Sequence, residues 1–168
     1  MKKKFLTIAI FITVNNFGFS QEEQVENKNP KSPSRIGGSV GSGINLAEFL
    51  TEHNDVRVDI FYHKTLSKFR FLSYNVGYID CVGRNSFIPI TVGINFFYPN
   101  NYIVPYYGFE IGISMDDRNI GFLLGSRSGI YVPIPKLNIC LGFGFTAQLA
   151  SNGTGFLSAN WTISYLLP

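Results

Sequence analysis

The sequence has little of what builds catalytic or metal sites. It contains two cysteines and two histidines, and neither Cys81 nor Cys140 has a histidine or a further thiol near it. Isolated thiols of this kind do not make a zinc site. The glycines of segment 35–46 are not followed by a helical pattern, so they do not form a phosphate-binding loop either. We therefore expect no cofactor and no metal.

A hydrophobic run long enough for a transmembrane helix is also missing. The strongly apolar stretch 5–14 is far shorter than the roughly 20 residues that a helix needs to cross a bilayer. It follows a run of lysines at 2–4 and precedes Gly18 and Ser20, which is the pattern of a secretory signal cleaved before Gln21. Residues 1–20 are predicted to be a cleaved signal peptide, with an uncleaved anchor as the alternative. No cysteine lies near the cleavage point, so no lipid anchor is expected.

The mature chain lacks an excess of charge. The whole chain has 14 Lys and Arg against 11 Asp and Glu, and the lysines at 2–4 account for the difference. A neutral chain without a basic run is not expected to bind nucleic acid. Residues 21–34 are almost devoid of apolar side chains and are predicted to be a disordered periplasmic leader. Residues 35–168 form a single predicted domain.

What the domain does have is a regular alternation of apolar residues with small or polar ones. In segment 88–98, for example, Ile90, Val92 and Ile94 alternate with Thr91 and Gly93. A period of two places the two classes on opposite sides of a sheet. Short polar turns divide the domain into eight such segments, as in membrane-spanning barrels, and no window has a helical period apart from room for one turn at 46–52. We predict an all-β fold, an eight-stranded antiparallel up-and-down transmembrane β-barrel, with strands near 35–46, 55–63, 68–79, 86–98, 102–115, 119–132, 137–149 and 155–167.

The composition of the two classes predicts which one faces outward. In a soluble barrel the exposed class is rich in lysine and glutamate, whereas here the second class is dominated by small and neutral groups, such as Gly142, Gly144 and Thr146. We therefore expect the apolar class to face lipid and the small class to fill a narrow interior. An even number of strands places both ends of the domain on the periplasmic side. The alternative is a soluble periplasmic or secreted barrel that encloses an apolar ligand, as lipocalins do.

Two groups of residues stand out within this layout. Arg57, Asp59, Glu110 and Arg127 fall on the inward class, where charges are costly unless they are paired. We expect them to form an ion-pair network in the lumen, with a contact between Glu110 and Arg127, and a role in gating or permeation is the alternative. Five tyrosines fall on the outward class near the ends of the strands, as expected of an interfacial aromatic girdle: Tyr62, Tyr78, Tyr98, Tyr107 and Tyr165.

Residues 35–168 resemble the small eight-stranded outer-membrane β-barrels of Gram-negative bacteria, the OmpA/OmpX/OmpW-like family. The most family-like stretches are FIPITVGINFFY at 87–98 and VPYYGFEIG at 104–112. The resemblance implies contact with outer-membrane lipid and insertion by the barrel-assembly machinery. That machinery usually recognises a terminal aromatic residue, whereas this chain closes on Pro168. We expect a monomer with two free thiols, because Cys81 and Cys140 fall on non-adjacent strands.

These features favour a non-enzymatic barrel with a structural or envelope-interaction role, or minor permeation of small solutes. An eight-stranded lumen is generally too narrow for a general porin. Barrels of this size also include enzymes that modify outer-leaflet lipid with a histidine, a serine and an acid near the outer rim. Here His53 lies in the predicted first external loop beside Glu52 and Asp55 without a recognisable serine, and His63 lies at the periplasmic end. A lipid-modifying enzyme is therefore the second alternative.

Overall fold

The computed structural model describes residues 34–45, 55–67, 69–81, 86–98, 102–116, 119–151 and 155–167. The predicted signal peptide, the predicted leader up to residue 33, the possible helical turn at 46–52 and Pro168 lie outside the described residues. Within the described ranges, no helix is both long and apolar enough to span a bilayer.

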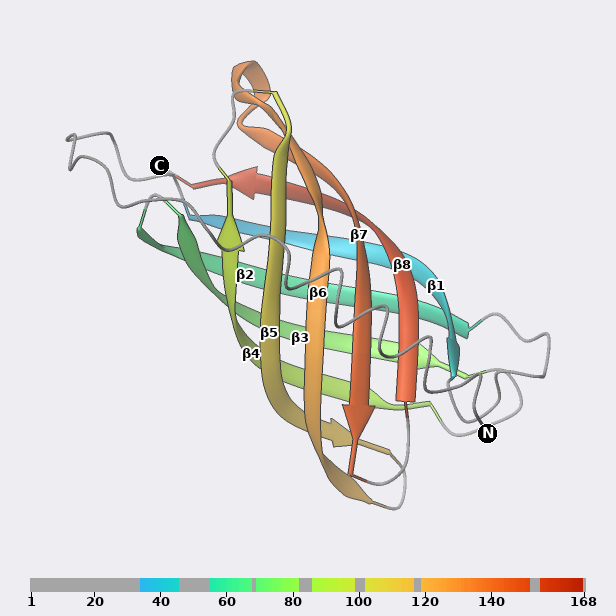
Figure 1. Cartoon of the computed structure of the whole chain (residues 1–168). Helices are drawn as coiled ribbons and strands as arrows, with labels where there is room; N and C mark the ends of the chain where they lie inside the picture. The colour runs from blue at the N-terminus through green and yellow to red at the C-terminus, as the bar shows by residue number, and fades with distance from the viewer. Residues whose placement is uncertain are drawn as a thin grey trace, which may run out of the picture. The chain divides into compact units, whose positions relative to one another are not determined.

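Eight antiparallel strands close into a barrel (Figure 1), in which each strand pairs with its neighbours in sequence and the last strand returns to the first. The predicted fold class is confirmed. The strands are β1 (Arg35–Asn45), β2 (Asp55–Ser67), β3 (Arg70–Asp80), β4 (Ile88–Phe97), β5 (Val104–Met115), β6 (Ile120–Ile134), β7 (Ile139–Ala150) and β8 (Gly155–Leu166).

The strands end within two residues of their predicted bounds except at the end of β2, and two connections take a form that the sequence did not predict. β2 runs to Ser67 instead of ending at 63, with a register irregularity between Thr65 and Ser67. The Ser67 hydroxyl accepts a hydrogen bond from the Phe69 amide at 3.3 Å, which holds a tight turn and moves the start of β3 to Arg70. The other difference is a 3-10 turn, η2 (Pro135–Leu137), followed by Asn138 in the left-handed region at φ 53°. Because proline and left-handed asparagine favour turns, β7 begins at 139 and not at 137.

The two ends of the barrel are distinguished by what they carry. β1 begins and β8 ends at one end, which we call the terminal end; the β2–β3, β4–β5 and β6–β7 connections lie there too. The other end, which we call the loop end, carries the β1–β2, β3–β4, β5–β6 and β7–β8 connections. Both ends of the domain therefore lie on the same side of the barrel, as an even strand number requires.

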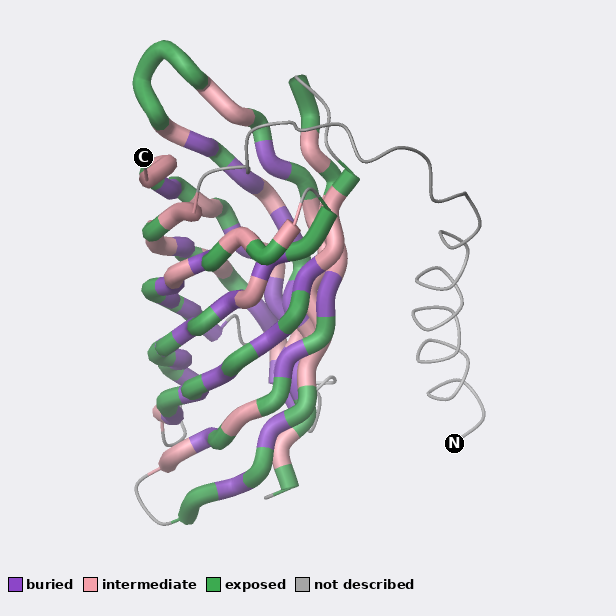
Figure 2. Tube along the Cα trace, turned by 90° about the vertical axis from the view of Figure 1, so that its left-hand side faces the viewer, coloured by how far each residue is buried: buried purple, intermediate pink, exposed green. Residues whose placement is uncertain are grey.

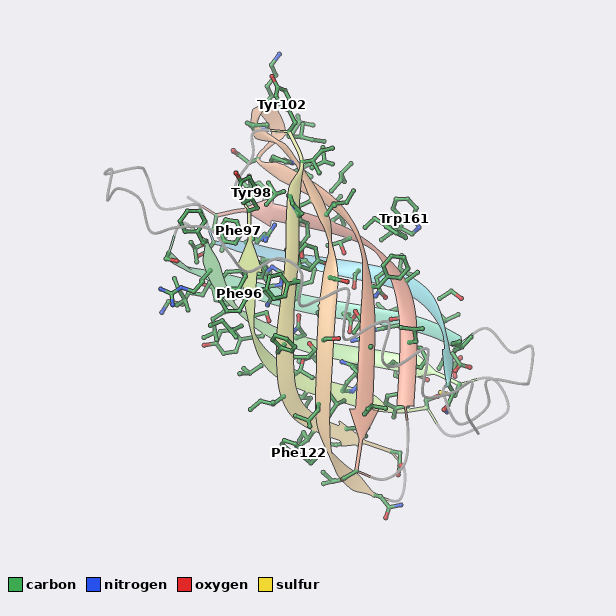
Figure 3. All side chains as sticks on the ribbon, viewed as in Figure 1. Phe96, Phe97, Tyr98, Tyr102, Phe122 and Trp161 are labelled. Atoms are coloured by element: carbon green, nitrogen blue, oxygen red, sulfur yellow. The ribbon has the colours of Figure 1, made fainter. Side chains whose placement is uncertain are left out.

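The apolar class of residues faces outward, as predicted. Along β4, Ile90, Val92 and Ile94 are exposed, whereas Thr91 and Gly93 between them are buried. Figure 2 shows the same alternation of buried and exposed residues along most strands. Large exposed side chains such as Phe122 and Trp161 project away from the barrel wall in Figure 3. The fold thus has an apolar outer wall around a polar interior.

Candidate functional site in the barrel lumen

Arg57 and Asp59 form a buried bidentate ion pair in the lumen. They lie two residues apart on β2 and so point to the same side of the sheet. Arg57 Nε lies 2.8 Å from Asp59 Oδ2, and Arg57 Nη2 lies 2.9 Å from Asp59 Oδ1. Ser39 on β1 donates a further hydrogen bond to Asp59 Oδ2 at 3.0 Å. Two parallel charge-assisted bonds fix both the position and the orientation of the guanidinium.

A second ion pair joins β5 and β6. Arg127 Nε lies 2.7 Å from Glu110 Oε2, so the expected contact between these residues is present. Glu110 is 3% exposed, and it also accepts hydrogen bonds from Thr91 at 3.0 Å, Gln148 at 2.5 Å and Asn75 at 3.5 Å. Its carboxylate is therefore surrounded by donors from four different strands, β3, β4, β6 and β7.

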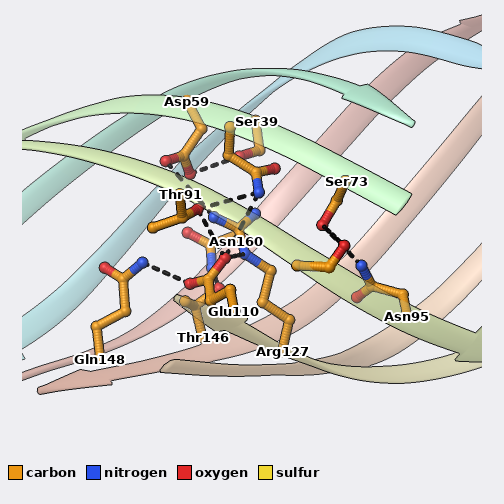
Figure 4. Close-up of polar contacts among 12 residues, drawn as sticks. Ser39, Asp59, Ser73, Thr91, Asn95, Glu110, Arg127, Thr146, Gln148 and Asn160 are labelled. Atoms are coloured by element: carbon orange, nitrogen blue, oxygen red, sulfur yellow. Dashed lines mark hydrogen bonds and ion pairs between the residues drawn. The ribbon is translucent and has the colours of Figure 1, made fainter. Parts of the chain in front are cut away.

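Gln148 joins the two ion pairs into one network, most of which Figure 4 shows in close-up. Its Oε1 accepts from Arg57 Nη1 at 2.8 Å, while its Nε2 donates to Glu110. Arg127 Nη2 also lies 3.9 Å from Asp59 Oδ1. The structure thus brings together all four charged residues expected in the lumen, two cations and two anions. The charges of the group balance, which removes most of the cost of burying each one alone.

Glycine makes the room that this network needs. A Cβ atom added at Gly77 on β3 would lie 2.3 Å from Asp59 Oδ1 and 3.0 Å from the Pro89 ring. Real side chains do not approach this closely, so any larger residue at 77 would displace the Asp59 carboxylate.

Clusters of large apolar side chains occupy the lumen on either side of the network. At the loop end, Ile79, Cys81, Phe87 and Phe156 pack together, with the two phenylalanine rings edge to face at 6.0 Å. At the terminal end, the terminal plug contains Phe71, Tyr131 and Cys140, with Phe97, Val104, Tyr106 and Leu166 packed against them.

A cation reinforces the terminal plug. The Arg35 guanidinium lies 3.9 Å from the centre of the Tyr131 ring and 4.8 Å from that of Phe71, within the range of cation–π attraction. The Tyr106 and Tyr131 rings stack at 4.4 Å. The lumen is therefore layered, with charges between two apolar clusters.

The tyrosines predicted to form a girdle all lie on the outward side of the wall. Tyr78, Tyr98 and Tyr165 are exposed, whereas Tyr62 and Tyr107 are partly covered by stacking on Tyr74 and Phe96. The strand register places Tyr78 towards the loop end and the other four towards the terminal end.

The chain is similar to solved structures in its fold. No protein-family model and no curated protein matches it. Among solved structures, Neisserial surface protein A (NspA) matches with a TM-score of 0.69 at 8% identity, over 80% of this chain and 97% of that one. The chain has the fold of the small outer-membrane barrels.

Two further structures of this kind extend the comparison. Ail, the attachment invasion locus protein of Yersinia pestis, has a TM-score of 0.55 at 13% identity, over 80% of this chain and 96% of that one. The outer membrane enzyme PagL has a TM-score of 0.56 at 11% identity, over 80% of this chain and 99% of that one. The predicted resemblance is confirmed at the level of the fold. Because the structures with this fold include an outer membrane enzyme and a surface protein, the fold does not decide the activity.

Several lumen residues of this small barrel were not expected from the sequence. Phe71, Tyr131 and Phe156 are large apolar residues on the inward class, and Arg35 lies at the first position of β1. His63, expected near the periplasmic end, is buried in the lumen with its ring 4.4 Å from that of Phe61 and 4.5 Å from that of Phe71. The sequence did offer one signal for the aromatic residues: they are large side chains at inward positions that elsewhere hold small or polar ones.

The remaining candidates for chemistry are the two thiols and His53. Cys81 and Cys140 are both buried, and no disulfide joins them in the described part of the chain. Among the described residues, no group of three histidine, cysteine or acidic side chains is arranged to hold a metal ion. His53 and Glu52 lie outside the described residues.

Proposed function

We propose that the protein is an exported, non-enzymatic barrel of the Gram-negative outer membrane with a structural or envelope-interaction role. The observation that carries the proposal is the apolar outer wall. Every one of the eight strands contributes exposed large hydrophobic side chains. Soluble monomers rarely expose contiguous apolar patches larger than a few hundred Å², whereas a lipid-facing barrel needs such a belt over its whole circumference.

The tyrosines near the ends of the strands also support membrane insertion. The five outward tyrosines are distributed towards both rims, where rings that are apolar on one side and polar at the tip suit the boundary between lipid and water. A closed barrel also leaves no strand edge unpaired, so its backbone needs no partner chain within hydrocarbon. We therefore include a monomeric state in the proposal, with insertion by the barrel-assembly machinery.

The layered lumen favours a structural role over permeation. An ion passing along the axis would have to displace the loop-end cluster, the charge network and the terminal plug in turn. The cavity found between the network and the terminal plug has a volume of about 10 Å³, which is the space of about one water molecule. We accordingly expect no steady conductance from the protein in planar bilayers.

The lipocalin-like alternative requires the opposite arrangement. An apolar ligand needs an enclosed apolar pocket, and a soluble carrier needs a polar outer wall. Here the outer wall is apolar and the centre of the lumen holds two paired cations and two paired anions. These features do not favour a carrier of apolar ligands.

The second alternative, a lipid-modifying enzyme, predicts a separate result. Overexpression would then change the acyl chains of outer-leaflet lipid, and the change would disappear in His53→Ala. We expect no such change, because the sequence offers no recognisable serine to accompany His53, and the other histidine, His63, is enclosed in the lumen between Phe61 and Phe71.

Cell fractionation tests the proposal. We expect the protein in the outer-membrane fraction, released only by detergent, and migrating differently on gels before and after boiling. Recovery in the soluble periplasmic fraction without detergent would contradict it.

A further inference from the structure

A small polar cavity lies between the charge network and the terminal plug. Among the residues that line it are Arg127 of the network, Tyr106 and Tyr131 of the plug, and His63 and Asn160. Its volume of about 10 Å³ matches the lower limit for holding a single water molecule.

Three buried polar atoms of these lining residues have no hydrogen-bond partner among the described residues: His63 Nδ1, Arg127 Nη2 and Asn160 Oδ1. His63 is 5% and Asn160 is 6% exposed. Arg127 Nη2 lies 3.9 Å from Asp59 Oδ1, close enough for charge attraction but beyond hydrogen-bond distance. Native proteins rarely leave buried polar atoms unpaired, and the residues that carry these three atoms line one cavity.

We propose that this cavity is a binding site for one structural water molecule, held by His63, Arg127 and Asn160. A water molecule accepts one hydrogen bond from Arg127 Nη2 and donates two, to Asn160 Oδ1 and to the unprotonated Nδ1 of a neutral His63 ring. Three bonds is the usual number for a buried water. The donors and acceptors of the site therefore match those of water one for one.

The same atoms argue against an anion. A halide ion accepts hydrogen bonds but donates none, so it would be attracted by Arg127 and repelled by the lone pairs of Asn160 Oδ1 and His63 Nδ1. A halide ion is also larger than a water molecule, and the cavity volume of about 10 Å³ is at the lower limit for water.

The water joins the charge network to the terminal plug. It links Arg127, and through Arg127 also Glu110, to the ring of His63, which packs against Phe71 of the terminal plug. The stacked rings of Tyr106 and Tyr131 lie on one side of the water, and Arg127 of the charge network lies on the other. The water site requires only the folded barrel, so it does not depend on the proposed location in the outer membrane.

Crystallography of the folded full-length protein, grown in sodium bromide at a resolution that shows ordered water, tests the proposal. We expect one density peak within about 3.2 Å of all three atoms, without anomalous signal at the bromide edge. A bromide peak at this position, or no peak within reach of the three atoms, would overturn the proposal.

Variants then test what holds the water. Asn160→Leu removes the acceptor, together with the amide hydrogen bonds to Thr146 and Ser158, and the peak should disappear. The matched control is Ser114→Ala, which removes a buried hydroxyl that also has no partner among the described residues but does not line the cavity; here the peak should remain. Retention of the peak in Asn160→Leu, or its loss in Ser114→Ala, contradicts the assignment.

A second measurement does not depend on the variants folding. In the wild-type protein, the ¹⁵N chemical shift of His63 Nδ1 should be that of an unprotonated nitrogen that accepts a hydrogen bond. A free unprotonated nitrogen or a protonated one would each overturn the proposal.

Discussion

Removing one partner of the Glu110–Arg127 ion pair should destabilise the barrel strongly, whereas removing both should not. Arg127→Met keeps an apolar chain of similar length but leaves the Glu110 carboxylate, which is 3% exposed, without its cation. Breaking a buried pair in this way costs about 3–5 kcal/mol. Because Glu110 retains hydrogen bonds from Thr91, Gln148 and Asn75, we expect the lower end of that range, about 3 kcal/mol.

The double variant Glu110→Gln with Arg127→Met separates charge from packing. It leaves no unpaired charge at this position, so we expect it to lie within about 1–2 kcal/mol of the wild type, because replacing both members of a buried pair is often close to neutral. The resulting coupling in the double-mutant cycle is then at least about 1 kcal/mol. Arg70→Ala is the matched control, since Arg70 is exposed and its loss should cost less than about 0.5 kcal/mol.

Reversible denaturant unfolding of the protein refolded in detergent or lipid measures these differences. The change in mobility between folded and boiled protein on gels and the fluorescence of Trp161, the only tryptophan in the chain, report the transition. A value for Arg127→Met as small as that of Arg70→Ala, with no coupling in the cycle, would refute the view that the ion pair matters for stability.

Three further substitutions test other parts of the structure. Gly77→Ala should lower the free energy of unfolding by about 1–3 kcal/mol, because its Cβ would meet the Asp59 carboxylate at 2.3 Å, whereas Gly38→Ala, with its nearest contact at 3.3 Å, should cost clearly less; equal unfolding midpoints would count against the close fit. Arg35→Ala should cost about 1 kcal/mol through the lost cation–π contacts, and an unchanged midpoint would remove Arg35 from the terminal plug. Ile60→Arg, at a position that is 67% exposed on the outer wall, should cost about 2–4 kcal/mol in a bilayer, and a neutral effect there would contradict burial in lipid.

Much of this fold was predictable because a strand has only two faces. The alternation of Ile90, Val92 and Ile94 with Thr91 and Gly93 determines which side chains share a face, and the turn residues separate one strand from the next. The same reasoning placed Arg57, Asp59, Glu110 and Arg127 on the inward side. It missed the exact ends of β2 and β3, because the hydroxyl of Ser67 forms a turn where the alternation continues.

The composition of the lumen was less predictable. The alternation predicts that Phe71 and Tyr131 point inward. It does not predict that they meet across the barrel, because β3 and β6 are not neighbours in the sheet. Gln148 is a similar case: it joins Arg57 on β2 to Glu110 on β5 from a strand that pairs with neither. Contacts of this kind depend on the tilt and stagger of the closed barrel, which the residue pattern of a single strand does not encode.

The most direct test of the membrane assignment uses Trp161, which is 67% exposed on the outer wall near the middle of β8. Its fluorescence in the refolded protein can be measured in bilayers whose lipids carry bromine on the acyl chains. If the outer wall faces hydrocarbon, brominated chains should quench most of the emission, and iodide in the aqueous phase should quench little. Efficient quenching by iodide, with no effect of brominated lipid, would show that this wall faces water and would contradict the account.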